Sequence, residues 1–204
     1  MAGRKRNSED STRTRTAILD ATGTIMCEEG YAAVSSRRVA KAAGLRSQLV
    51  YYHFGAMDDL FLALYQRSEE AFFQAHARAL AARNPLRALW KLNSEARGAA
   101  LAMEFIALAN HRKVIRKEIA RSTERYRRLQ TAVFTRFLEE RGVAAEAMSP
   151  EVLSFLMVSL SRGLVTETAI GIDLAHDAVR QAVEAWLEKL EPQDPPAEGE
   201  PSPS

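Results

Sequence analysis

Apolar residues repeat at intervals of three and four along most of the chain, which is the period of an α-helix and not of a β-strand. No stretch alternates apolar and polar residues for long enough to form a strand, and no segment is repeated. Residues 149–170 follow the helical spacing, and near the C-terminus it runs through Leu174, Ala178, Val179, Ala182, Val183, Trp186, Leu187 and Leu190. The sequence therefore predicts an all-α fold of about nine helices.

Prolines and glycines indicate where these helices begin and end. Pro85 and Pro150 each follow a good N-cap residue, as expected for the first position of a helix. Glycines 30, 44, 55, 142 and 171 fall between periodic segments, where a helix end needs a residue that tolerates positive φ. We expect helices at 11–29, 36–43, 47–53, 57–83, 85–94, 97–110, 112–141, 149–170 and 174–190.

The charge of the chain is divided unevenly along its 204 residues. Residues 1–54 hold nine Lys or Arg against five Asp or Glu, whereas residues 139–204 hold four against thirteen. A basic N-terminal third is typical of a surface that binds phosphates. Chance clustering on solvated helix faces explains the charge alone equally well.

Composition also excludes several classes of protein. The single cysteine, Cys27, rules out an internal disulfide and a cysteine-based zinc site. The longest stretch without Asp, Glu, Lys or Arg runs only from 47 to 57, so we expect no membrane span. The N-terminus has no apolar run behind its basic residues, which predicts a protein that is not secreted and stays in the cytoplasm.

One segment carries a functional motif. Residues 35–54, SSRRVAKAAGLRSQLVYYHF, place a short helix, a turn at Gly44 and a second short helix in sequence, as in a helix-turn-helix. Val39, Ala40 and Val50 are expected to face inward. The outward positions of the second helix carry hydrogen-bonding side chains, and no acidic residue lies between Lys41 and Asp58. Such a helix fits the major groove of DNA, although a packed helical hairpin without a ligand explains the apolar positions alone.

The same segment, together with ILDATGTIMCEEGY at 18–31 and the following GAMDDLF, resembles the N-terminal domain of the tetracycline-repressor (TetR) family of bacterial transcription regulators. The resemblance covers about the first 61 residues, and the rest of the chain is similar only in helix number and length. It implies a homodimer that binds a palindromic operator and releases it when a small molecule enters the C-terminal domain. It also implies a DNA-binding site formed by Ser36, Arg37, Ser47, Gln48, Leu49, Tyr51, Tyr52 and His53.

This resemblance divides the chain into four parts. We expect a basic disordered arm at 1–10, a DNA-binding domain at 11–56, a ligand-binding and dimerisation domain at 57–190, and a disordered acidic, proline-rich tail at 191–204. Five basic residues near the N-terminus are candidates to reach the minor groove or a neighbouring phosphate: Arg4, Lys5, Arg6, Arg13 and Arg15. A solvated leader is the alternative.

The C-terminal part gives weaker signals. The broad apolar stripes at 149–170 and 174–190, with the small residues Gly163 and Ala182, predict the homodimer interface. Apolar residues between 97 and 137 with a few polar ones among them predict a pocket for a largely apolar effector, although each is also compatible with ordinary core. The candidate pocket residues are Met103, Phe105, Ile106, Asn110, His111, Tyr126, Phe134 and Phe155.

Two alternatives stay open. The basic run at 111–128 is compatible with a solvated, ion-paired helix face and also with recognition of an anionic ligand. A constitutive architectural DNA-binding protein is the main competitor of a ligand-controlled repressor. We find no catalytic or metal-binding motif and expect neither an enzyme nor a cofactor.

Overall fold

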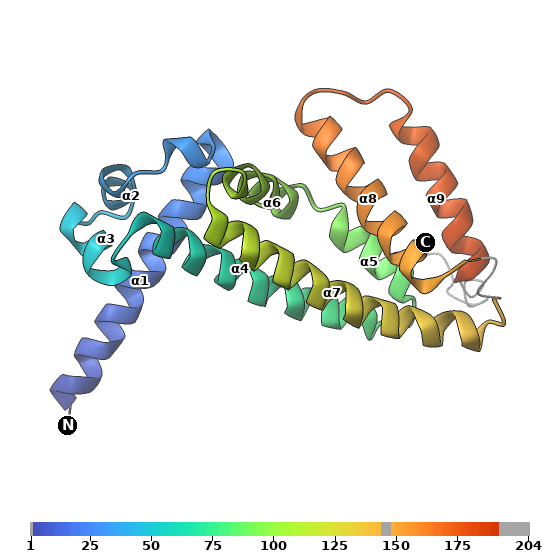
Figure 1. Cartoon of the computed structure of the whole chain (residues 1–204), viewed down its shortest axis with the longest axis horizontal. Coiled ribbons are helices and arrows are strands. Elements are labelled where there is room, and N and C mark those ends of the chain that lie inside the picture. Colours follow the sequence, from blue (N-terminus) through green and yellow to red (C-terminus); the bar gives the residue numbers. More distant parts are fainter. Residues whose placement is uncertain (1, 144–147, 192–204) are drawn as a thin grey trace, which may run out of the picture. The chain divides into compact units, whose positions relative to one another are not determined.

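A computed structural model describes residues 2–143 and 148–191, and these contain nine α-helices, one short 3₁₀ helix and no strand (Figure 1). The predicted all-α class is therefore confirmed. The elements are α1 (Ala2–Glu29), η1 (Tyr31–Ala33), α2 (Ser36–Ala42), α3 (Ser47–Phe54), α4 (Met57–Leu80), α5 (Pro85–Asn93), α6 (Ala96–Ala109), α7 (Lys113–Glu140), α8 (Pro150–Ala169) and α9 (His176–Leu190).

The helix ends lie within three residues of the predicted ones, with one exception. Helix α1 begins at Ala2, so residues 2–10, which we expected to form a disordered arm, continue the helix instead. The segment contains no proline, and its one glycine, Gly3, lies in the first turn, so no strong helix breaker interrupts the helix. Ser149 caps α8 by accepting a hydrogen bond from the backbone N of Val152 at 3.2 Å, and Pro150 follows at the first position.

The described chain divides into two compact units, Met1–Ala75 with Glu95–Gln130, and His76–Ser94 with the described part of 131–204. The first unit contains the helix-turn-helix segment, α6 and the first part of α7. Its core includes the fully buried side chains of Ile18, Met26, Val39, Leu60 and Ile115. The boundary that we expect at residue 57, between a DNA-binding domain and a ligand-binding domain, is defined by function and not by compactness, and it stays a prediction.

The second unit builds its core from α5, α8, α9 and the last part of α7. Leu86, Leu89, Phe134, Leu153 and Leu187 are fully buried in it. At its surface, the Arg87 guanidinium of α5 pairs with Glu184 and Glu188 of α9. These contacts join α5, α8 and α9 into one body.

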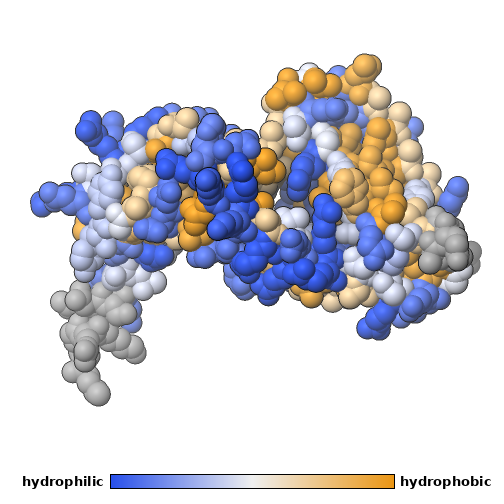
Figure 2. Space-filling model, in the orientation of Figure 1, coloured by the Kyte–Doolittle hydropathy of each residue, from blue (hydrophilic) through white to orange (hydrophobic). Residues whose placement is uncertain are grey.

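Helix α8 buries one apolar face and exposes another. Leu153, Met157 and Leu164 are buried, whereas a second row of apolar side chains on α8 is between 38% and 51% exposed: Val152, Phe155, Leu156 and Leu160. The turn before α9 exposes Ile170, Ile172 and Leu174 in addition. Figure 2 shows these apolar surfaces in orange over α8 and the α8–α9 turn. The stripe that we identified in residues 149–170 is thus mostly the exposed face.

By length and composition alone, α8 is the one helix of the described residues that is apolar enough to cross a membrane. We expected no such segment from the sequence. The helix carries Glu151, Arg162 and Glu167 and packs its inner face into the second unit. An apolar core helix passes the same test, and this packing favours that interpretation.

Glu191 corrects the expected extent of the C-terminal tail. Its side chain is buried, and its two carboxylate oxygens accept hydrogen bonds from the backbone N of Leu86 at 2.8 Å and of Arg87 at 3.0 Å. These two donors belong to the first turn of α5, which has no partner for them within the helix. Glu191 therefore belongs to the second unit. The rest of the expected tail, 192–204, lies outside the described residues.

Removing this carboxylate tests the assignment of Glu191. A chain that ends at Glu191 should keep the stability of the full chain, whereas Glu191→Ala should lower the free energy of unfolding by about 2 kcal/mol because two buried N–H groups lose their acceptor. Urea denaturation measures both. Glu184→Ala is the matched control, since it removes an exposed ion pair that contributes at most ~1 kcal/mol. Equal, small effects of the two substitutions would contradict the assignment.

Candidate nucleic-acid interface

Helices α2 and α3 form a helix-turn-helix within the first unit. Ser35 accepts a hydrogen bond from the backbone N of Arg38 at 3.4 Å and so caps the start of α2. Gly44 adopts φ of 68° in the turn between the helices, a conformation that disfavours any residue with a side chain. Val39 and Val50 are buried on the inner faces of the two helices, as predicted. The buried faces fix which side chains α3 can present to solvent.

The outer face of α3 carries the predicted groove-facing side chains. Ser47 and Gln48 are exposed, Tyr51 is 51% exposed and Tyr52 is 79% exposed. Two adjacent exposed aromatic side chains form a small apolar patch, and exposed apolar patches can mark interaction surfaces. The structure thus brings four of the predicted DNA contacts onto one surface of one helix.

Of the other four predicted contacts, three are half-buried and one is exposed. Leu49 and His53 are half-buried, and the His53 ring meets the Tyr52 ring edge to face at a centroid distance of 5.1 Å. At the start of α2, Ser36 is half-buried and Arg37 is exposed.

Exposed cations surround this surface. Lys41 at the end of α2 and Arg46 directly before α3 are exposed, as Arg37 is. Arg38, by contrast, pairs with Glu29 at the end of α1 and so ties α2 to α1. The cations that lie next to α3 therefore reinforce a positive surface that fits phosphates.

Two polar contacts connect α6 and the α6–α7 turn to η1 and α4, the elements that flank the helix-turn-helix. The Glu104 carboxylate of α6 accepts a hydrogen bond from the backbone N of Tyr31 in η1 at 2.7 Å. Arg112, directly before α7, pairs with Asp58 in the first turn of α4 at 3.0 Å. The sequence analysis missed both contacts, because 73 residues separate Glu104 from Tyr31 and no local pattern joins them.

Arg15 does not lie in a free arm. It is a residue of α1, and its guanidinium donates a hydrogen bond to the backbone oxygen of His53 at 3.0 Å. The same group lies 4.2 Å from the centre of the Phe54 ring. Arg15 therefore contacts the last turn of α3.

The candidate pocket residues are spread over both units. In the first unit, Phe105 is buried with its ring against Tyr65 at a centroid distance of 5.1 Å, Met103 is half-buried, and Ile106 is 42% exposed. In the second unit, Phe134 is a core residue and Phe155 lies on the exposed face of α8. Phe105 and Phe134 are therefore parts of different cores.

Three more candidates lie at the end of α6 and on α7. Asn110 and His111 are exposed, and the His111 ring is 6.1 Å from that of Tyr31. Tyr126 is buried, with its ring 5.1 Å from Phe72, and its hydroxyl accepts a hydrogen bond from Gln130 at 3.0 Å.

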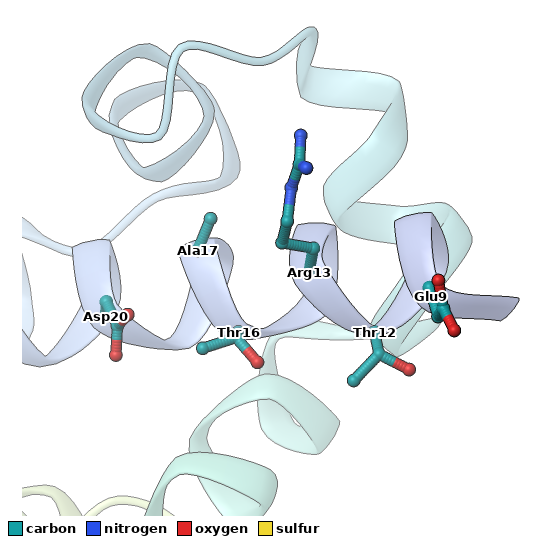
Figure 3. Close-up of a pocket in the computed structure, with 6 residues that line it drawn as sticks. All are labelled: Glu9, Thr12, Arg13, Thr16, Ala17 and Asp20. Carbon is teal, nitrogen blue, oxygen red and sulfur yellow. The ribbon is translucent and has the colours of Figure 1, made fainter. Parts of the chain in front are cut away.

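A surface hollow in the first unit is lined by one face of α1 alone (Figure 3). Its residues recur at three and four positions: Glu9, Thr12, Arg13, Thr16, Ala17 and Asp20. In Figure 3, Thr12 and Thr16 point to one side of the helix and Arg13 to the other. The hollow does not include any of the predicted pocket residues.

Intramolecular partners account for much of the charge in the basic run at 111–128. Arg121 is shared by Glu118 and Glu69, with its shortest contact to Glu118 at 2.6 Å, and Arg128 pairs with Glu124. The hydrogen bond from Arg121 lowers the pKa of Glu118 below its ordinary value. These contacts favour the interpretation of the run as an ion-paired helix face.

No group of three or more His, Cys, Asp or Glu side chains within the described ranges is placed to hold a metal ion. His76 is buried and contacts the Asn93 side-chain oxygen at 2.9 Å, and His176 contacts Glu167 at 2.9 Å. Both histidines thus have neutral or acidic protein partners in the second unit.

Residues 18–64 match the family model described as bacterial regulatory proteins of the tetR family. The matched range begins within α1 and includes η1, α2, α3 and the first turns of α4, which are the elements that form the surface described above. A search of curated proteins finds no significant match.

Solved structures resemble the chain over most of its length. A protein from Rhodococcus sp. described as a TetR-family transcriptional regulator has a TM-score of 0.71 at 19% identity, covering 88% of this chain and 99% of its own. A TetR transcription regulator from Haloarcula marismortui has a TM-score of 0.68 at 20% identity, covering 87% and 98%. NalD, the secondary repressor of the MexAB-OprM multidrug efflux pump in Pseudomonas aeruginosa, has a TM-score of 0.58 at 21% identity, covering 86% and 96%.

The described residues form an all-helical protein with an N-terminal helix-turn-helix whose exposed side chains suit DNA. Residues 18–64 are similar to the N-terminal domain of the TetR family of transcriptional regulators, which is the resemblance that the sequence analysis identified. The solved structures extend the likeness in fold beyond the matched domain.

The contact between Glu104 and Tyr31 can be tested by paired substitutions. Glu104→Ala leaves the Tyr31 N–H without its acceptor and should lower the free energy of unfolding by about 1 kcal/mol or more. Glu104→Gln keeps a side-chain oxygen at the same place and should retain most of the stability. Urea denaturation, with amide hydrogen exchange at Tyr31, measures both effects. Equal losses would show that charge, rather than the hydrogen bond, stabilises η1.

Proposed function

We propose that this protein is a repressor that binds a palindromic operator as a homodimer and releases it when a small molecule binds. The observation that carries the proposal is the outer face of α3, where Ser47, Gln48, Tyr51 and Tyr52 are exposed together. NalD, a structural neighbour, is described as a repressor, which supports the same role here. Such a protein acts in the cytoplasm, where the chromosome lies.

Each proposed DNA contact has a chemical role. The Gln48 amide suits adenine, to which it can donate and from which it can accept a hydrogen bond in the major groove. Leu49 suits the methyl group of thymine, and Ser47 suits a base edge or a phosphate. Tyr51, Tyr52 and His53 are assigned to the DNA backbone or base edges.

The start of α2 completes the proposed contact surface. Arg37 is exposed there, and Ser36 lies beside it at the first position of the helix. Their charge and hydroxyl suit phosphate oxygens, and such contacts orient a protein on DNA without selecting a sequence.

We assign the dimer interface to α8 and α9. The exposed row on α8 is bulky and includes Phe155, Leu156 and Leu160. On α9, Ala178 and Ala182 are exposed and small. Bulky side chains of one copy can pack over small ones of the other under two-fold symmetry, which buries a surface too apolar to stay in water.

Effector release is the finer part of the proposal. Helix α6 carries several of the candidate pocket residues, and its Glu104 also holds η1 beside the DNA-binding helices. A ligand that shifts α6 would therefore also displace η1, the element that directly precedes α2. The apolar and aromatic side chains of Phe105 and Tyr126 favour a largely apolar effector.

Selection of DNA from a random pool, followed by a release assay, tests the function. We expect a palindromic consensus bound with Kd of about 10⁻⁸ M or tighter at physiological salt. A screen of small molecules against the bound complex should then find one that releases DNA. Binding without a consensus sequence would contradict the repressor. A consensus with no releasing compound would favour the ligand-independent architectural alternative.

Gln48 and Tyr52 should differ in the kind of loss that their replacement causes. Gln48→Ala should cost about 1–3 kcal/mol at one operator position and relax specificity there, because a base contact is lost. Tyr52→Ala should weaken binding to all sequences alike if the hydroxyl binds phosphate. Binding to a panel of single-base operator variants distinguishes them. Equal losses on every sequence for both substitutions would refute the role of Gln48.

An added charge on α9 tests the dimer interface. Ala182→Arg should convert the dimer to a monomer and abolish tight operator binding, since a buried, unpaired cation opposes association and one half-site has too few contacts. Ala132→Arg adds the same side chain at an exposed position of α7 and should leave the dimer intact. Sedimentation at micromolar concentration reports the mass. A dimer that persists in Ala182→Arg would place the interface elsewhere.

A further inference from the structure

The end of the recognition helix α3 is held by a side chain from α1. A helix leaves its last carbonyl oxygens without partners inside the helix. In α3, the backbone N of Gly55 caps the oxygen of Tyr51 at 2.8 Å, and Arg15 donates to the oxygen of His53 at 3.0 Å. A cation at a helix C-terminus is also favoured by the helix dipole.

The same guanidinium makes a second contact with the last residue of α3. It lies 4.2 Å from the centre of the Phe54 ring, and Phe54 is only 6% exposed. Phe54 is anchored in the core of the first unit. Arg15 thus contacts one backbone atom and one anchored ring, which restrains the last turn of α3 in both position and rotation.

This restrained turn carries the most exposed aromatic side chain of the candidate interface, that of Tyr52 at 79%. Tyr52 precedes His53, and the two rings meet edge to face at 5.1 Å. A displacement of the His53 backbone would therefore move the Tyr52 ring as well. Tyr51 and Gln48 lie on the same short helix and would turn with it.

We propose that Arg15 is a positioning residue for DNA recognition: it acts on DNA through α3, by holding the last turn of this helix against α1. The proposal rests on the proposed function in one respect, namely that α3 reads the operator. It differs from the sequence-based expectation, in which Arg15 belonged to a group of cations that reach the DNA directly.

The two roles of Arg15 predict different salt dependence. Loss of a phosphate contact lowers the slope of log affinity against log salt by roughly 0.9 per subunit and weakens specific and non-specific DNA alike. Loss of a positioning contact leaves the slope unchanged. It also lowers affinity for the operator while affinity for non-specific DNA stays the same.

The experiment measures operator and non-specific DNA binding over a salt series for the full chain. Arg15→Gln should weaken operator binding about tenfold, the size expected from a lost helix-end cation and a lost cation–π contact. Arg15→Lys keeps the charge and one donor, and should recover part of that loss. Arg136→Gln removes the same charge from an exposed site in the second unit and should have no effect.

A double-mutant cycle shows whether Arg15 acts through α3. In the Tyr52→Ala background, Arg15→Gln should cost clearly less than in the wild type, because the side chain that it positions is gone. Thermal unfolding verifies that each variant is folded at the assay temperature. If Arg15→Gln is not folded, the ratio of operator to non-specific affinity in Arg15→Lys decides, and it should fall below the wild-type ratio.

Three results would overturn the proposal: a lower salt slope with equal losses on both DNAs, additive losses in the cycle, or unchanged operator affinity in the folded variants. Failure of the wild type to select any operator would instead overturn the proposed function. The two failures are therefore distinguishable.

Discussion

The burial of Val50 and Phe54 in the core of the first unit determines what α3 can do. Both side chains are buried on an eight-residue helix, in a core cluster that also includes residues of α1, α2, α4 and α6. Helical geometry then directs Ser47, Gln48, Tyr51 and Tyr52 to the outer side. No other element is needed to expose these four side chains. The orientation of α3, however, depends on how firmly Val50 and Phe54 are packed in the core.

Three polar contacts fix the orientation of η1, α3 and α4, which the apolar core holds together. Glu104 holds the start of η1, Arg15 holds the end of α3, and Arg112 pairs with the first turn of α4. Each joins a helix end to a residue distant in sequence. Apolar burial is not directional, whereas a hydrogen bond to one backbone atom specifies position. The DNA-binding helices are thus packed by their core and oriented by these contacts.

The second unit combines specific polar contacts with an exposed apolar surface. Glu191 binds the two N–H groups at the start of α5, and Arg87 pairs with Glu184 and Glu188. Helix α8, in contrast, leaves a row of bulky apolar side chains in solvent. An exposed apolar surface of this kind marks an interaction site, and it is the surface to which we assign the proposed dimer, in which one interface serves both chains.

The sequence by itself determined most helix ends, the turn at Gly44, the inward positions Val39 and Val50, and the resemblance of the N-terminal segment to the TetR family. These depend on neighbours three or four residues apart, on caps and on glycine conformation, all of which are visible locally. Only the tertiary structure decided that Glu191 is buried, that Arg15 contacts α3, and that the stripe on α8 faces solvent. Glu191 and Leu86 are 105 residues apart, and Arg15 and His53 are 38 apart. Such contacts arise only when the chain folds, because the helical period shows which residues share a face but not what that face packs against.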